Sequence, residues 1–187
     1  PTVGRKPTRA LWAAGMRTGM IEAVAEDRAR AGFDAIEVQA MGISFKKFVR
    51  DLKEDPWEMA RMVARKMPNV TKGCPAGAFI HLFEAPPPRS IIELYYTRLA
   101  DTGVLNRAQM VTNSVGQTRN FPWLVPLYKN LGMQICLALS YTISPRHTDE
   151  YYAQKTRELL AYKPDVIMLK DQGGLLTVDR IRTLLPV

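Results

Sequence analysis

The chain alternates between short apolar runs and longer segments in which apolar residues return every three or four positions. The first pattern is typical of strands buried on both faces, and the second is typical of amphipathic helices. The expected strands are residues 35–38, 70–75, 104–111, 134–141 and 166–169. The expected helices are residues 20–31, 45–53, 56–66, 90–101, 119–130, 148–162 and 177–185. Asp55 is expected to cap one helix, and Ser90 with Glu93 to form a capping box on another.

The predicted helices end at turns with nearly regular spacing. These ends fall at Gly32, Asn69, Gly103, Gly132 and Pro164, in steps of 29 to 37 residues. Steps of this length fit βα units, because parallel strands need helical crossovers. The sequence therefore predicts an α/β fold with a parallel sheet, arranged as a small open sheet or as an incomplete barrel, since a complete (β/α)8 barrel takes about 250 residues. We expect residues 1–187 to form this single partial domain.

Composition and charge narrow the functional classes. The chain has 187 residues, of which 47% are hydrophobic, and a formal net charge of +8. Most basic residues alternate with acidic ones, as on solvated helix faces, so we do not expect nucleic-acid binding. Two cysteines do not make a disulfide scaffold, and no apolar run is long enough to cross a bilayer. We expect no secretory signal, no membrane association and a reduced, cytoplasmic setting.

Several motifs occur in the order found in one enzyme family. They are Leu-Trp-Ala at 11–13, Leu-Lys-Glu-Asp-Pro-Trp-Glu at 52–58, Ser-Tyr-Thr-Ile-Ser-Pro at 140–145, Leu-Lys-Asp at 169–171 and Gly-Leu-Leu at 174–176. In these motifs the chain resembles the carboxyltransferase domain of pyruvate carboxylase, the pyruvate subunit of transcarboxylase and the alpha subunit of oxaloacetate decarboxylase. Their superfamily includes hydroxymethylglutaryl-CoA lyase. The resemblance implies a TIM-barrel fold, here divergent and C-terminally short.

The resemblance also implies a chemistry. The family moves a carboxyl group between biotin, carried on a separate domain, and a 2-oxo acid such as pyruvate or oxaloacetate, with a divalent metal that holds the enolate. By resemblance, Lys170 matches the lysine that is carbamylated to become a metal ligand, so it is a candidate catalytic residue and metal ligand. Arg107 lies on the strand where the family has Phe-Arg, and Tyr141 and Thr142 end another strand. Together with Arg9, these three are candidate substrate-binding residues.

The chain departs from the family where metal and substrate should be held. Lys6 stands at the position of an aspartate ligand, Arg9 at a glutamine that touches substrate, and Gly77 at a substrate-binding arginine. The family's two histidine ligands would lie beyond Val187. A cation cannot replace an anionic oxygen ligand. We therefore expect this chain alone to bind no stoichiometric zinc or manganese.

Three functional hypotheses stay open. A subunit of a biotin-dependent carboxyltransferase or 2-oxo-acid lyase is favoured by the retained Lys170 and the 140–145 run. A non-catalytic interaction or scaffold subunit is favoured by Lys6, Arg9 and Gly77. The third hypothesis is metal-free chemistry on an anionic substrate held by Lys6, Arg9 and Lys170. Because an incomplete barrel leaves open sheet edges, we expect another protein chain, or a second copy, to complete or cover it.

Overall fold

The computed structural model describes residues 15–38, 45–76, 87–112 and 118–186. Within them, five strands form one parallel sheet, in the order β1-β2-β3-β4-β5. The strands are β1 (Ala35–Glu37), β2 (Thr71–Pro75), β3 (Arg107–Val111), β4 (Gln134–Ser140) and β5 (Val166–Lys170). The helices are α2 (Thr18–Arg30), η1 (Phe48–Leu52), α4 (Pro56–Lys66), α5 (Arg89–Asp101), α7 (Phe121–Asn130), α8 (Asp149–Leu160) and α9 (Val178–Leu184). The predicted parallel α/β fold is confirmed.

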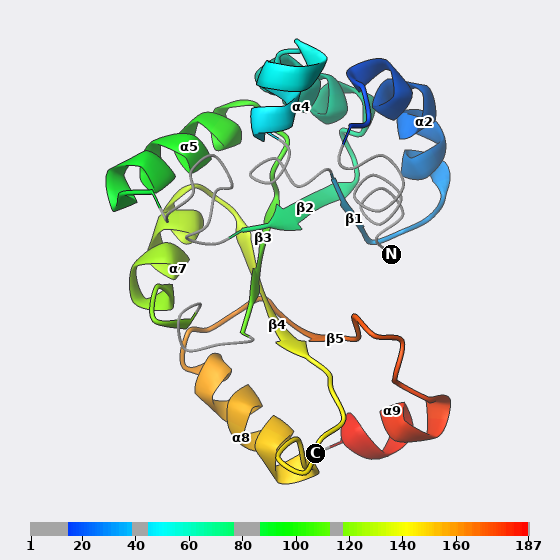
Figure 1. Cartoon of the computed structure of the whole chain (residues 1–187), viewed down its shortest axis with the longest axis vertical. Coiled ribbons are helices and arrows are strands. Elements are labelled where there is room, and N and C mark those ends of the chain that lie inside the picture. Colours follow the sequence, from blue (N-terminus) through cyan, green and yellow to red (C-terminus); the bar gives the residue numbers. More distant parts are fainter. Residues whose placement is uncertain (1–14, 39–44, 77–86, 113–117, 187) are drawn as a thin grey trace.

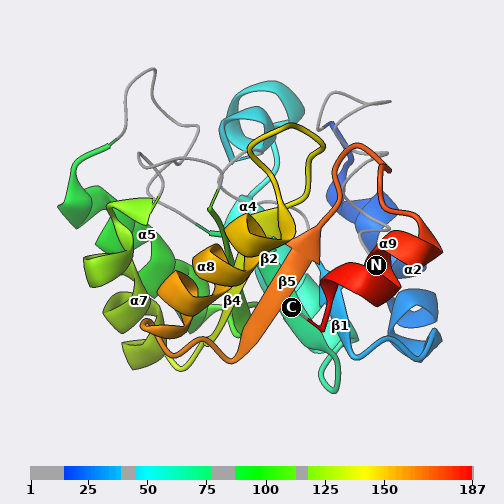
Figure 2. The same cartoon turned by 90° about the horizontal axis from the view of Figure 1, so that it is seen from below.

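The strands and helices form a half-barrel. Helices α2, α4, α5, α7 and α8 follow one another around the outside of the strands (Figure 1). Helix α9 lies apart from this row, and a view from below places β5 between α8 and α9 (Figure 2). Of the two arrangements that the sequence left open, the structure has the incomplete barrel.

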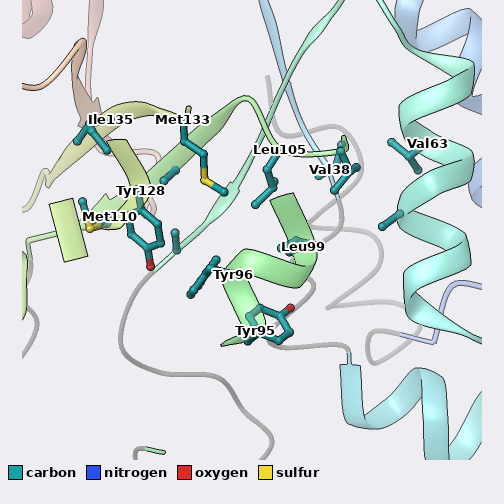
Figure 3. Close-up of a cluster of buried hydrophobic side chains, with 14 of the residues drawn as sticks. Val38, Val63, Tyr95, Tyr96, Leu99, Leu105, Met110, Tyr128, Met133 and Ile135 are labelled. Atoms are coloured by element: carbon teal, nitrogen blue, oxygen red, sulfur yellow. The ribbon is translucent and has the colours of Figure 1, made fainter. Parts of the chain in front are cut away.

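The main core lies between the strands and the outer helices (Figure 3). Ala108, Ile135 and Leu137 have no exposed surface and belong to this core. Tyr96 of α5 meets Tyr128 of α7 edge-on, with ring centroids 4.8 Å apart. Successive strand residues point to opposite faces of a sheet. The residues between these core positions therefore face the inside of the half-barrel.

One of the two predicted helix caps is present in the structure. The carboxylate of Asp55 accepts a hydrogen bond of 2.8 Å from an amide in the first turn of α4, as expected. The predicted capping box is wrong. Helix α5 begins at Arg89 with Pro88 as its N-cap residue, so Ser90 already lies within the helix and caps nothing. Glu93 instead binds the Arg89 side chain at 2.7 Å, which is the ordinary pairing of residues four apart on a helix.

The predicted helix at 45–53 is partly a π-helix, η1, and its C-cap residue, Lys53, has the left-handed conformation (φ 57°). The next residue, Glu54, reaches across to the start of α2. Its carboxylate accepts hydrogen bonds of 2.8 Å from both the amide and the hydroxyl of Thr18, and it pairs with Arg17 at 2.9 Å. An anion at a helix N-terminus satisfies amides that have no partner within the helix. Glu54 therefore joins η1 to α2.

Candidate functional site

A cavity of about 370 Å³ opens at the carboxyl ends of β4 and β5. Its walls include Ser140, Tyr141, Thr142, His147 and Gln172. In barrels of parallel strands, binding and catalytic residues gather at this end, because the loops that follow the strands meet there. This cavity, called the mouth cavity below, is the candidate functional site.

Two predicted residues, Tyr141 and Thr142, line the mouth cavity, and a residue of α8 holds both. The Tyr152 hydroxyl accepts a hydrogen bond from the Thr142 amide (3.0 Å) and donates one to the Thr142 carbonyl (3.2 Å). The Tyr152 ring also stacks on Tyr141, with centroids 5.8 Å apart and planes 24° apart. Burial raises the pKa of Tyr152 above its ordinary value, so the hydroxyl keeps its proton at neutral pH. Tyr152 therefore fixes the backbone that forms this wall.

An imidazole lies on the same loop. Nδ1 of His147 and Oγ of Ser144 are 2.7 Å apart and share a hydrogen bond. The His147 ring also meets Tyr151 edge-on, with centroids 4.7 Å apart. His147 and Gln172 are not among the predicted site residues. The signal that points to His147 is its position, two residues after the 140–145 run and directly before the helix cap Thr148.

The loop after β5 closes on an aspartate. Oδ2 of Asp171 accepts a hydrogen bond of 2.8 Å from the Leu176 amide. Amides of the loop, first Leu176 and then Leu175, lower the pKa of Asp171 below its ordinary value, so it stays a carboxylate. Gly174 takes a positive φ of 68°, which suits glycine in such a tight turn. Asp171 thus fixes the loop that carries Gln172 to the cavity.

Lys170 ends β5 and is the register partner of Ser140 in β4. Burial raises the pKa of the Cys136 thiol above its ordinary value. The positive charges of Arg107 and Lys170 offset part of this increase. Both cations therefore lie near Cys136, on the inside of the half-barrel. Lys170 is half-buried there, next to a strand residue that lines the mouth cavity.

Arg107 lies at the other end of its strand. It is the first residue of β3, and its Nε and Nη2 donate hydrogen bonds of 3.0 Å and 2.8 Å to Oε1 of Gln134, the first residue of β4. The structure therefore brings Tyr141 and Thr142 together, places Lys170 beside them, and does not bring Arg107 to the mouth cavity. Arg9 lies outside the described residues, as do Lys6 and Gly77. Its predicted role stays a prediction.

The described residues do not form a divalent-metal site. Among them, no three histidine, cysteine, aspartate or glutamate side chains lie close enough together to hold a metal ion. The positive charges of Arg107 and Lys170 act on Cys136 and would also repel a divalent cation there. Oδ2 of Asp171, the carboxylate next to Lys170 in sequence, already accepts the hydrogen bond of the Leu176 amide. The metal content of the purified chain stays a prediction.

No protein-family model matches the chain. Curated relatives are carboxylase and carboxyltransferase subunits. A pyruvate carboxylase subunit from Methanocaldococcus jannaschii is 29% identical over 94% of this chain and 30% of its own length. The large subunit of 2-oxoglutarate carboxylase from Hydrogenobacter thermophilus is 27% identical over 86% of the chain and 24% of its own length. The methylmalonyl-CoA carboxyltransferase 5S subunit of Propionibacterium freudenreichii is 28% identical over 78% of the chain and 28% of its own length.

Solved structures with a similar fold include carboxyl transferase domains. The carboxyl transferase domain of Rhizobium etli pyruvate carboxylase, with pyruvate and biocytin, superposes with a TM-score of 0.83. It is 23% identical, and the match covers 98% of this chain and 32% of that one. The chain resembles the carboxyltransferase domain of pyruvate carboxylase. The predicted resemblance and the partial TIM-barrel fold are thus confirmed. The chain spans less than a third of the length of each of these curated relatives. Among its described helices, none is both long and apolar enough to cross a membrane.

Proposed function

We propose that this chain contributes one wall of a cytoplasmic, biotin-dependent carboxyltransferase site that acts on a 2-oxo acid, with pyruvate or oxaloacetate as the first substrates to test. The observation that carries the proposal is the position of Lys170. It ends β5, beside the mouth cavity, in a half-barrel that resembles carboxyltransferase domains. The named relatives act in carboxylation or carboxyl transfer, which agrees with this proposal.

The residues of the chain suit an anionic substrate. Carboxyl transfer to a 2-oxo acid removes a proton from C3 and places negative charge on the 2-oxo oxygen. C3 then bonds to the carboxyl carbon of carboxybiotin while the bond between that carbon and the biotin nitrogen breaks, and the proton removed from C3 ends on this nitrogen. A fixed cation lowers the energy of such a developing oxyanion, above all where water is excluded. In the proposal, the charge of Lys170 faces this oxyanion, while Tyr141 and Thr142 orient the substrate from the cavity wall.

The test uses the complete natural polypeptide or complex that contains this chain, with Lys170 replaced by Ala. Oxaloacetate is supplied with biotin as carboxyl acceptor, and pyruvate is measured as it forms. Loss of a cation that faces the oxyanion lowers kcat by about 100-fold. The matched control is Lys46→Ala, since Lys46 is an exposed lysine that does not line the mouth cavity, and it leaves kcat unchanged. A Lys170→Ala protein with the wild-type kcat excludes Lys170 from the reaction, and a wild-type protein that makes no pyruvate excludes the function.

Exposed apolar side chains favour a second role, as a component that another polypeptide covers. Val178, the first residue of α9, is 64% exposed, and Leu185, just after its last residue, is 66% exposed. Every residue of β5 is also partly exposed. Exposed apolar surface of this kind marks interaction sites. Light scattering at micromolar concentration should give a mass above the 21.1 kDa of one chain. A folded monomer that binds no apolar dye contradicts this role.

A further inference from the structure

Helix α9 reaches the mouth cavity through one arginine. Nε of Arg180 donates a hydrogen bond of 3.3 Å to the Tyr141 hydroxyl. Nη2 of Arg180 binds Oδ1 of Asp149, the first residue of α8. These partners are 39 and 31 residues away in the sequence. Arg180 thus joins α9 to the end of β4 and to the start of α8.

This contact continues to the backbone of the cavity wall. Tyr141 is 8% exposed and stacks on Tyr152, whose hydroxyl binds the amide and carbonyl of Thr142. A guanidinium holds two acceptors in a fixed geometry, because its donors lie in one plane. Arg180 therefore restricts the Tyr141 ring, and the ring in turn supports the position of Tyr152 over Thr142.

Other contacts hold α9 less firmly. Leu184 is the one buried side chain among the residues of α9, and it joins a small apolar cluster with Tyr141 and Tyr152. Val178, at the start of the helix, points largely into solvent. A short helix with one buried side chain depends strongly on its polar anchors. The contact of Arg180 with Asp149 and Tyr141 is such an anchor, and it lies next to the cavity.

We propose that Arg180 is a positioning residue, which sets the orientation of Tyr141 and through it the shape of the mouth cavity for a 2-oxo acid. The part that names the ligand rests on the proposed function. Arg180 acts through Tyr141 and does not bind substrate, because Asp149 already neutralises its charge. Sequence resemblance does not reveal this role, since Arg180 lies outside the matched motifs.

The first test measures the cavity wall without any ligand. Hydrogen exchange of the Thr142 amide is compared in the wild type and in Arg180→Met. The control is Arg182→Met, which makes the same substitution on the same helix at a residue that pairs only with the exposed Asp179 among the described residues. We expect exchange about tenfold faster in Arg180→Met and unchanged in Arg182→Met. Equal exchange in the two variants, whether fast or slow, overturns the proposal.

The second test uses the complete natural protein with oxaloacetate as substrate. Arg180→Lys keeps a cation beside Asp149 but loses the planar donor pair, so it separates positioning from the folding of α9. We expect Arg180→Lys to raise KM about tenfold with kcat within about twofold of wild type, and to melt at the wild-type temperature. An unchanged KM overturns the positioning role. A wild-type protein with no activity on 2-oxo acids removes the proposed function, and the exchange experiment then decides on Arg180 alone.

Discussion

Replacing Tyr152 by Phe removes a single oxygen atom that makes two hydrogen bonds to one residue. Tyr152 is 4% exposed, and its hydroxyl is bound to the Thr142 amide at 3.0 Å and to the Thr142 carbonyl at 3.2 Å. A net hydrogen bond contributes about 0.5–1.5 kcal/mol, and an acceptor or donor left without a partner costs at least as much. The expected loss in the free energy of unfolding is therefore about 2 kcal/mol.

Thermal and urea unfolding, followed by circular dichroism, measure this loss. For a chain of this length, about 2 kcal/mol lowers Tm by roughly 4–8 °C. Tyr151→Phe is the matched control, because it makes the same change on the adjacent residue of α8 and leaves both Thr142 bonds in place. We expect it to change Tm by less than about 2 °C. Equal effects of the two substitutions, or a Tyr152→Phe protein as stable as the wild type, refute the assigned role of the hydroxyl.

Three further predictions concern the fold. Leu137 lies in the centre of β4 with no exposed surface, so Leu137→Ala should lower the free energy of unfolding in urea by about 2–5 kcal/mol. Leu94→Ala, on the outside of α5, should lower it by less than about 0.5 kcal/mol. Equal losses would contradict the core assignment. Asp55→Ala removes the cap of α4 and should cost about 1 kcal/mol, whereas Asp55→Asn should keep most of it. Burial lowers the pKa of Lys72 in the folded chain, so the unfolded chain binds this proton more tightly. The free energy of unfolding must therefore increase as the pH rises from the lowered folded-state pKa toward the ordinary value of about 10.4. Unfolding of the wild type and Lys72→Met, measured between pH 6 and about 10.5, should show this gain in the wild type alone; parallel curves would contradict it.

The sequence predicts most elements because their signals are local. Asp55 and Thr148 accept hydrogen bonds from amides two and three residues ahead, so the cap and the helix that it starts appear in one short window. The capping box at Ser90 fails for a local reason too. Helix α5 begins at Arg89, one residue before Ser90, and Pro88, with an extended ψ of 149°, takes the N-cap position that the box assigned to Ser90.

The site is less predictable, because its contacts join distant segments. Tyr141 and Thr142 can be chosen from their place at the end of a strand within a diagnostic run. The bond between Arg180 and Tyr141 cannot, since no local pattern connects residues 39 positions apart. Arg107 shows the opposite difficulty: its strand is predicted, but the residue lies at the amino end of that strand, away from the mouth cavity.

The order of the sheet has a consequence for how the chain is made. Every pairing among the described strands joins two strands that follow each other in the sequence, and β1 and β5 are the two edges of the described sheet. A pairing of this kind closes a loop of one βα unit, which costs little chain entropy compared with joining the two ends of a domain. During synthesis on the ribosome, each strand can therefore dock as soon as it emerges, with its neighbour already in place. We expect nascent chains cut after successive units to gain protease resistance in steps, with β5 protected last.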